Sequence, residues 1–517
     1  MVLGGVSNDP PRKVRRLLPE HESHRVYQER LRESILQILD RNPDLRTDVW
    51  EYTEVISLCY AMDLDRAAPI LRRTYARGGP LAIDPVVMLR ALLVMLYLHI
   101  ASFGELVSRL AGSTLLRAIV GCEHPPGRTT FYDFIARLPG FRAMARKDAK
   151  RRLRKKRKPR KKYPKGQKAP PRRPHIMQFL EHLRHADLIP QAEELVKTLN
   201  LLLDHAFVSI SIERGLIGGP QGLVAAGDSS SFVLHSSPYG RRTPECDCPL
   251  GTGDLHCPHL RVYAAPAADW NWESSEGRWV YGYRFYELTS ASGAELPLCI
   301  GLPSRPMQHD SITGYVVLHQ YHQLIGRPLA AGILDSAHDN EPTYRLLREM
   351  SAVPFIDLNL GGIADKATPI KKTEHLGLCG IDANGTPHCP MGAMLRRGHT
   401  RGYQRFVCPL RPNGLNCPHA ASCPKRSVHL KPAMSPRYVC EVPRGSLAWD
   451  KQYDRRTTVE RSHNRKKNDF GLEARRNRSR PVVFTLYLLA ACLQHVVEWA
   501  KRVNGKALLA SWLPQAA

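Results

Sequence analysis

The chain has 517 residues and carries 75 Lys and Arg against 48 Asp and Glu, which gives a formal charge of +27. Its length allows two or three domains with sizeable cores. Its charge predicts a polyanionic partner, with DNA or RNA favoured over an anionic membrane surface. No run of about 18 uninterrupted apolar residues appears, so no membrane-spanning helix is expected. The best candidate, residues 482–497, is interrupted by polar side chains and is interpreted as a buried helix.

The N-terminus and the cysteines indicate the cellular compartment in which the protein is expected. Residues 1–11 are polar and Gly-rich and lack a charged-then-apolar signal segment. Thirteen cysteines, an odd number, favour thiols and metal ligands over a disulfide framework. We therefore expect a cytosolic protein.

Residues 1–141 are predicted to form a helical domain that binds DNA or dimerises. Asp84 is expected to cap a helix that starts at Pro85, and Ser102 with Glu105 forms a capping box for the next. A further helix is expected from Thr129. Short helices with tight turns are typical of a helix-turn-helix module, but a plain bundle used for dimer contacts fits the same periodicity.

Residues 142–175 are predicted to be a basic linker. Between Arg142 and Arg173 the chain has eighteen Lys or Arg and one acid, so this segment holds +17 of the +27 charge. Such a segment should be solvated and self-repelling. Its charge density also favours contact with phosphates. The DNA-binding residues expected here are Arg151, Arg152, Arg154, Lys155, Lys156 and Arg157.

After a helical connector over residues 176–221, residues 222–480 are predicted to form an α/β core with a mixed sheet, and residues 481–517 a C-terminal helix. Two insertions interrupt the core, at about 240–275 and 360–450. The expected strands are 222–234, 278–288, 295–302, 328–335 and 353–358, and the expected helices are 311–324 and 341–350.

Three carboxylates from distant segments suggest one chemistry. Asp228 and Asp335 each end an apolar strand-like run, and Glu460 lies in a basic helical segment. Hard oxygen ligands of this kind suit Mg²⁺ (or Mn²⁺), which can assist cleavage of a phosphodiester bond. The alternative for a single Asp is a turn or a helix cap, and Asp339 is expected to be the N-cap of the following helix.

The segment around Glu460 has a regular spacing. Tyr453, Arg456, Glu460 and Lys467 fall on one face of a helix, because they are separated by three, four and seven residues. They can therefore point at one site. The alternative is an ion pair between Arg456 and Glu460 that serves only the helix.

These motifs resemble DDE-type transposases of bacterial insertion sequences, in the group with a Tyr-Arg-Glu-Lys signature. Tyr453, Arg456, Glu460 and Lys467 match the full signature. Gly-Asp-Ser-Ser at 227–230 is similar to the first-aspartate motif of the family, and Leu-Asp-Ser-Ala-His-Asp at 334–339 to the second. The family often has Tyr where His338 stands. Residues 84–138 resemble its N-terminal helical domain.

The resemblance implies an RNase H-like core that acts on the ends of its own mobile element. Water cuts the strand, and the freed 3′-hydroxyl attacks target DNA. Asp228, Asp335 and Glu460 would be catalytic and bind Mg²⁺, while Tyr453, Arg456 and Lys467 would contact DNA. The expected partner is double-stranded DNA, the expected assembly a homo-oligomer on it, and the expected location the prokaryotic nucleoid.

Two groups of soft ligands predict zinc. The first, within fourteen residues, comprises Cys246, Cys248, Cys257 and His259, and the second, weaker group comprises Cys389, Cys408, Cys417 and Cys423. The alternative is unligated thiols in loop-rich inserts.

Two other functions remain open at this stage: a DNA-binding protein with a decayed catalytic core, and a nuclease that cuts without joining. No Gly-x4-Gly-Lys-Ser/Thr loop appears, so no nucleotide cofactor is expected.

Overall fold

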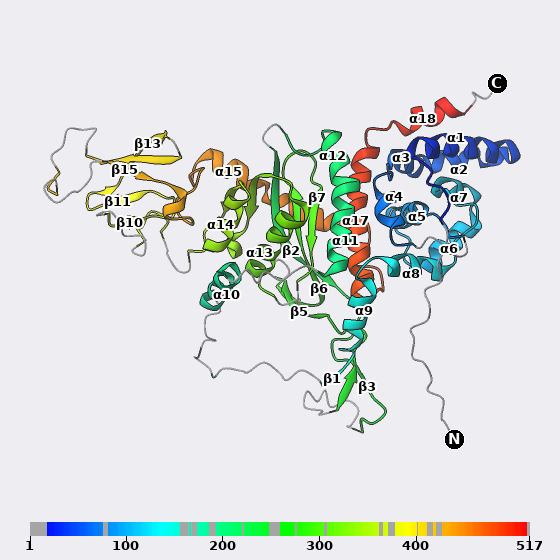
Figure 1. Ribbon diagram of the computed structural model, residues 1–517, viewed down its shortest axis with the longest axis horizontal. Coiled ribbons are helices and arrows are strands. Elements are labelled where there is room, and N and C mark those ends of the chain that lie inside the picture. The colour runs from blue at the N-terminus through cyan, green and yellow to red at the C-terminus, as the bar shows by residue number, and fades with distance from the viewer. Residues whose placement is uncertain are drawn as a thin grey trace, which may run out of the picture. The chain divides into compact units, whose positions relative to one another are not determined.

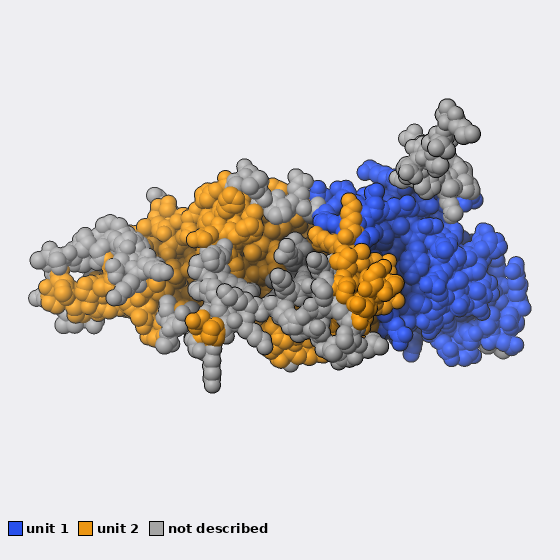
Figure 2. Space-filling view, turned by 90° about the horizontal axis from the view of Figure 1, so that it is seen from below, with its two compact units in different colours: residues 1–149, 193–211, 468–517 blue, residues 150–192, 212–467 orange. Residues whose placement is uncertain are grey.

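The computed structural model describes residues 18–75, 81–155, 164, 167, 173–185, 193–219, 222–247, 259–273, 277–303, 308–360, 365–370, 378–400, 402–410, 417–419 and 427–513. The chain divides into two compact units (Figures 1 and 2). Unit 1 comprises residues 1–149, 193–211 and 468–517, and unit 2 comprises residues 150–192 and 212–467.

Unit 1 is helical. Its helices are α1 (His24–Arg41), α2 (Arg46–Glu51), α3 (Thr53–Ala61), α4 (Ala67–Arg72), α5 (Pro85–Tyr97), α6 (Phe103–Gly112), α7 (Thr114–Val120), α8 (Arg128–Arg137), α9 (Phe141–Ala149), α11 (Glu194–Leu203), the first residues of α12 (Ser209–Glu213), α17 (Arg480–Ala500) and α18 (Gly505–Trp512). A π-helical turn, Asp204–Val208, joins α11 to α12.

The predicted helix starts are confirmed. Asp84 caps α5, where its side chain accepts a hydrogen bond from the Val86 N–H at 2.7 Å. Ser102 accepts from the Glu105 N–H, and Glu105 reaches back to the Ala101 N–H at 3.0 Å. These bonds satisfy backbone donors that have no partner inside the helix.

Helix α17 is the buried helix expected near the C-terminus, and it belongs to unit 1. It packs against α3, α5, α9 and α11, so segments far apart in sequence share one core. Two described helices, Arg480–Ala500 and Glu194–Glu213, are long and apolar enough to cross a membrane. Both are mostly buried inside the protein, as core helices of this composition are, so their length and hydropathy are only weak support for a membrane span.

Unit 2 is built on a six-stranded mixed sheet. Its strands are β2 (Leu223–Val233), β5 (Asp269–Glu273), β6 (Arg278–Ser290), β7 (Pro297–Gly301), β8 (Leu329–Leu334) and β9 (Val353–Ile356). The strand order is β5-β6-β2-β8-β9, and β7 also pairs with β6. Strands β2, β8 and β9 are parallel, whereas β6 is antiparallel to its neighbours. The predicted α/β class with a mixed sheet is therefore confirmed; of these strands, β5 was not predicted.

Helices cover both faces of this sheet. Tyr286 and Glu287 are neighbours in β6, so their side chains point to opposite faces. Tyr286 approaches Gly314 of α13 (Asp310–Gln320), and Glu287 bonds to Ser462 of α16 (Thr457–Asn464). Helix α13 therefore lies on one face and α16 on the other. Helices α10 (Arg173–His185) and α14 (Glu341–Glu349) contact α13.

The second insertion forms small sheets with their own core. One sheet contains β10 (Gly380–Ile381), β11 (Pro387–Cys389) and β12 (Gly392–Ala393), and the other contains β13 (Leu395–Thr400), β14 (Tyr403–Val407) and β15 (Ser427–Leu430). Their shared apolar cluster includes Ile381, Met394, Phe406, Leu430 and Val439. Helix α15 (Leu447–Tyr453) then leads back to the main sheet.

The basic segment differs from the predicted linker. Its first residues form α9, where Asp148 is buried and pairs with Arg480 at 2.9 Å. The next residues form β1 (Leu153–Lys155), which pairs with β4 (Leu260–Val262), and β4 pairs with β3 (Arg241–Arg242). The rest of the predicted linker lies mostly outside the described residues.

Candidate active site

The two predicted aspartates lie at matching positions on neighbouring parallel strands. Asp228 follows Gly227 in β2, Gly227 is paired with Leu334 of β8, and Asp335 follows directly. Because parallel strands run in the same direction, the two carboxylates lie together where the pairing of β2 and β8 ends, a place that we call the carboxylate edge.

Glu460 is linked to this edge through Arg456. The Arg456 guanidinium lies 3.3 Å from Asp228 and 2.8 Å from Glu460. The segment is not the single helix expected, because a 3-10 turn, Asp454–Arg456, separates α15 from α16. The predicted ion pair between Arg456 and Glu460 exists, and it also engages the first aspartate.

Asp228 has an unusual protonation equilibrium. Burial, together with the charges of Asp335 and Asp310, raises its pKa from 3.8 to about 7. Two carboxyl groups at one buried edge thus cannot both ionise easily without added positive charge.

We expect Asp228→Asn to raise thermal stability in a pH-dependent way in buffer without divalent cations. From pH about 4 to about 7 the unfolded chain has lost this proton while the folded chain keeps it, so wild-type stability falls with rising pH over this window. Asn does not ionise. The Tm difference between variant and wild type should grow over this window and level off above pH 7. A calorimetric Tm difference that is constant from pH 4.5 to 8.5 would contradict the shift.

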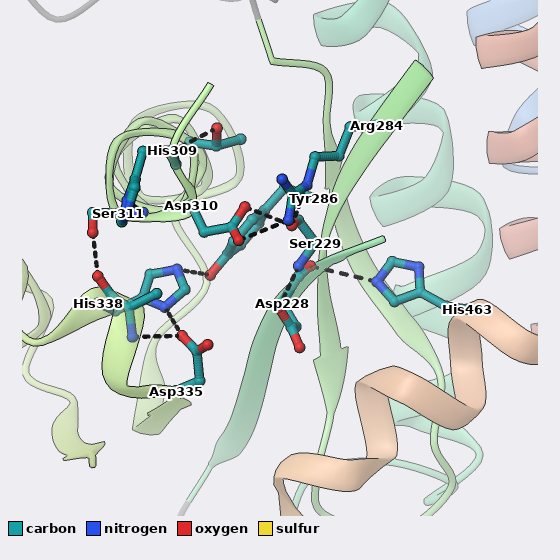
Figure 3. A network of polar contacts seen from close by, with 12 residues as sticks. Asp228, Ser229, Arg284, Tyr286, His309, Asp310, Ser311, Asp335, His338 and His463 are labelled. Carbon is teal, nitrogen blue, oxygen red and sulfur yellow. Dashed lines mark hydrogen bonds and ion pairs between the residues drawn. The ribbon is translucent and has the colours of Figure 1, made fainter. Parts of the chain in front are cut away.

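His338 holds the second aspartate (Figure 3). Its Nδ1–H donates to Asp335 at 2.6 Å, and its Nε2 lies 2.9 Å from the Tyr286 hydroxyl. Burial opposes the charged imidazole, but the hydrogen bond and charge of Asp335 outweigh it and raise the pKa of His338. Burial opposes ionisation of Asp335, but this hydrogen bond and the charges of His338 and Arg456 together lower its pKa. The aspartate is therefore kept ionised and fixed in direction.

A second polar group supports Asp228 from the α13 side (Figure 3). Asp310, at the start of α13, accepts from the Ser229 hydroxyl at 2.5 Å and from Arg284 at 2.8 Å. Ser229 is the neighbour of Asp228 in β2. The bonds fix this part of β2 against β6 and α13.

Gly314 makes room for the His338–Tyr286 contact, and we expect Gly314→Ala to be destabilising. Gly inside a helix normally costs about 1 kcal/mol relative to Ala. Here an added Cβ would lie 2.5 Å from His338 Nε2 and 2.7 Å from the Tyr286 hydroxyl, so it would overpack the site at a cost of about 1–3 kcal/mol. Urea denaturation measures this effect.

The matched control is Gly104→Ala in α6. Its Cβ would approach no atom closer than 3.8 Å, so the urea midpoint should stay or rise. If Gly314→Ala raised the midpoint as much as Gly104→Ala, Gly314 would not be required at this contact.

Beneath the edge, on the α16 face, lies a fully buried ion pair. The Lys466 ammonium is 2.9 Å from Glu287, which is the direct cross-strand neighbour of Asp228. Ser462 donates to Glu287 at 2.5 Å and also accepts from Lys466. His463 donates to the Asp228 carbonyl at 3.4 Å, and burial lowers its pKa to about 3, so it is neutral. This network attaches the helix of Glu460 to the strand of Asp228.

The other residues of the predicted signature take separate places. Lys467 donates to the Ser230 hydroxyl at 2.6 Å, two residues beyond Asp228. Tyr453 stacks on Trp449 with ring centroids 4.6 Å apart. Lys467 thus lies beside the carboxylate edge, whereas Tyr453 packs against the apolar cluster that includes Trp449 and Val459.

Of the basic residues expected to bind DNA, Arg151 and Arg152 are exposed. The backbone of Arg154 and Lys155 forms part of β1. Lys156 and Arg157 lie outside the described residues.

The first cysteine group is described only in part. Cys246 is half-buried and His259 lies 3.8 Å from Asp247, while Cys248 and Cys257 lie outside the described residues. Zinc at this group stays a prediction.

The second cysteine group is also incomplete. Cys389, Cys408 and Cys417 are half-buried, and Cys423 is outside the described residues. Within the part of the chain that the structure describes, no three His, Cys, Asp or Glu side chains converge as a metal-binding group. Glu460 is held by Arg456 instead of meeting both aspartates.

The expectation for Asp339 is wrong. Asn340 is the N-cap of α14, and its side chain accepts from the Thr343 N–H at 3.0 Å. Asp339 is buried and pairs with Arg437 of the second insertion at 2.5 Å. Asn340 therefore caps the helix, and Asp339 forms an ion pair with the distant Arg437.

Sequence reasoning missed several supporting residues: Tyr286, Glu287, Asp310, Gly314 and Lys466. Only Asp310 had a signal in the sequence, because it stands at the start of an expected helix, where an acidic residue is favourable. The rest depend on strand register.

Comparison with known families gives one finding. Residues 51–137, which include helices α3 to α8, match the family model described as Transposase domain (DUF772). No curated protein matches the chain. The match supports a transposase family, an enzyme that acts on DNA, and DNA as the partner.

Proposed function

We propose that this protein is a DDE transposase, which cuts the ends of its own insertion-sequence DNA and joins them to target DNA. The observation that carries the proposal is the register of β2 and β8, which places Asp228 and Asp335 each one residue beyond the last parallel pair, Gly227 and Leu334. The transposase match lies in unit 1 and is independent of these residues.

The sheet supports an RNase H-like core as the scaffold. It combines antiparallel β6 and β7 with parallel β2, β8 and β9, and it has α13 and α16 on opposite faces. In such a scaffold strands hold two acids and a packed helix brings the third.

The donor set fits a hard divalent cation. Asp228 and Asp335 offer only oxygen at one edge, and burial together with the charges of Asp335 and Asp310 raises the pKa of Asp228. Asp228 and Asp335 would hold Mg²⁺ (or Mn²⁺), and Glu460 would join them once its ion pair with Arg456 opens. When bound, the ion supplies activation of water and stabilisation of the leaving oxygen.

The chain's own residues orient these groups and hold DNA. His338 fixes Asp335, and Tyr286 fixes the His338 ring. Arg456 and Lys467 lie within hydrogen-bond reach of Asp228 and Ser230, where they would grip phosphates beside the scissile bond. Arg151 and Arg152 would contribute sequence-independent phosphate contacts. A homo-oligomer would bring two DNA ends together.

A joining assay tests the function. Labelled duplexes carrying the inverted repeats that flank the gene are incubated with the full chain, Mg²⁺ and a supercoiled plasmid. Cutting, followed by transfer of the 5′-labelled strand into the plasmid through its new 3′-hydroxyl, is expected. Cutting without transfer would identify a nuclease, and binding without cutting would identify a DNA-binding protein with a decayed core.

A further inference from the structure

A group of aromatic rings, three of them exposed, lies on strands β5 and β6, away from the carboxylates. Trp270 and Trp272 alternate along β5, and the register places them opposite Tyr281 and Trp279 of β6. We name these four residues the aromatic ladder. Their ring centroids are 5.6 Å apart for Trp270 and Tyr281, and 5.5 Å for Trp272 and Trp279.

The tryptophans of the ladder are far more exposed than is usual for this residue. Their exposed fractions are 37% for Trp270, 49% for Trp272 and 48% for Trp279. They account for three of the chain's seven tryptophans. Clustered apolar rings on a surface mark an interaction site more often than chance exposure does.

The ladder is held rigidly from behind. Asp269 and Asn271 alternate with the tryptophans of β5, and both are buried. The Tyr281 hydroxyl donates to the Ala265 carbonyl at 3.4 Å. The indole faces are therefore presented on fixed strands, so little conformational entropy would be lost when a ligand binds.

The chain that carries the ladder is strongly basic, with a formal charge of +27. Ala265, which contacts Tyr281, lies three residues beyond β4, where Arg261 is directly opposite Arg242 of β3. Like charges directly opposite each other destabilise a sheet, so a phosphate near this pair would be favourable. Aromatic faces next to arginines are the combination that binds single-stranded nucleic acid.

We propose that the aromatic ladder is a stacking platform for unpaired bases of a DNA strand, with the neighbouring arginines on its phosphates. This rests on the proposed function only for DNA as the ligand. A second copy of the chain fits less well, because docking two ladders would bring the two sets of arginines together.

The platform lies at a defined distance from the candidate active site. Glu287, opposite Asp228, and Trp279 are eight residues apart on β6, so roughly 27 Å separates them along the strand. The ladder would therefore bind bases that are remote from the scissile phosphate. Such unpaired bases would arise where the strands separate during end processing or target capture.

The test compares single-stranded and duplex DNA. Fluorescence anisotropy of a labelled mixed-sequence oligonucleotide, alone or annealed to its complement, gives Kd for the full chain over a range of salt. Trp272→Ala/Trp279→Ala should raise Kd for the single strand by about tenfold or more. Kd for the duplex should change less than about twofold, because paired bases do not expose their faces. The salt slope should be unchanged, because stacking releases no counterions.

Three controls keep the result decisive. Trp50→Ala removes another exposed indole, in α2, and should leave both Kd values unchanged. Trp272→Phe/Trp279→Phe keeps aromatic faces and should retain most of the single-strand affinity, even if the alanine variant fails to fold. Sedimentation velocity of wild type and both variants reports self-association.

The proposal is overturned if single-strand Kd is unchanged in the alanine variant, if duplex affinity falls equally, or if the variant loses a wild-type dimer. If one of these results is obtained with a chain that still joins DNA, the ladder proposal is refuted and the transposase proposal is unaffected. Loss of single-strand binding in a chain that never cuts DNA would support the ladder and refute the transposase.

Discussion

Replacing Asp335 by Asn should lower the rate of strand cleavage at least about 10³-fold, equivalent to about 4 kcal/mol of transition-state stabilisation. The substitution keeps the size of the side chain and an oxygen that can accept from His338 Nδ1. It removes the negative charge that we assign to metal binding. Single-turnover cleavage of labelled inverted-repeat DNA measures the loss.

Asp454→Asn is the matched control. Asp454 is an exposed acid in the 3-10 turn before α16, close in sequence to Glu460. Its variant should cleave like wild type. Both variants should bind DNA with wild-type affinity, since neither side chain attracts phosphate. Cleavage by Asp335→Asn within tenfold of wild type would show that this carboxylate is not catalytic.

Lys466→Met should destabilise the protein by about 3–5 kcal/mol. The substitution leaves the Glu287 carboxylate fully buried with no cation, although the Ser462 and Thr289 hydroxyls still donate to it. It also loosens the helix that carries Glu460. The urea midpoint is the primary measurement, and cleavage by the folded fraction is the second.

A double variant separates charge from packing. Glu287→Gln removes the orphaned charge but keeps an acceptor for both hydroxyls, so Lys466→Met/Glu287→Gln should recover much of the lost stability. Lys501→Met breaks an exposed pair with Glu498 and should change stability by less than about 0.5 kcal/mol. Equal losses in the single and double variants would show that packing, not charge, dominates at Lys466.

Local signals explain what could be predicted of the fold. The cap at Asp84 and the run ending in Asp335 depend on neighbours within a few residues, and both were confirmed. Strand β5 was missed because it is short and its Asp and Asn face a buried surface that only β6 creates. The core of the second insertion was missed because its apolar residues are spread from Ile381 to Val439.

In the candidate site, too, some residues could be predicted from local sequence and others could not. The sequence predicted Asp228, Asp335, Arg456 and Glu460, and the structure brings the arginine into contact with two of these acids. It could not predict Glu287 as the partner of Lys466, because that pairing depends on how α16 lies on β6. Whether these residues act as assigned stays a prediction.

Unit 1 is built from segments that are far apart in the sequence, and this affects how it folds during synthesis. Helices α3, α5 and α9 leave the ribosome early, yet α17, which covers them, is translated some 330 residues later. At common rates of synthesis the delay is roughly 20–70 s. The matched transposase domain therefore emerges with its apolar surface uncovered and completes its fold only when translation is nearly finished. A chain that lacks α17 would leave this apolar surface exposed and would be a substrate for chaperones and proteases.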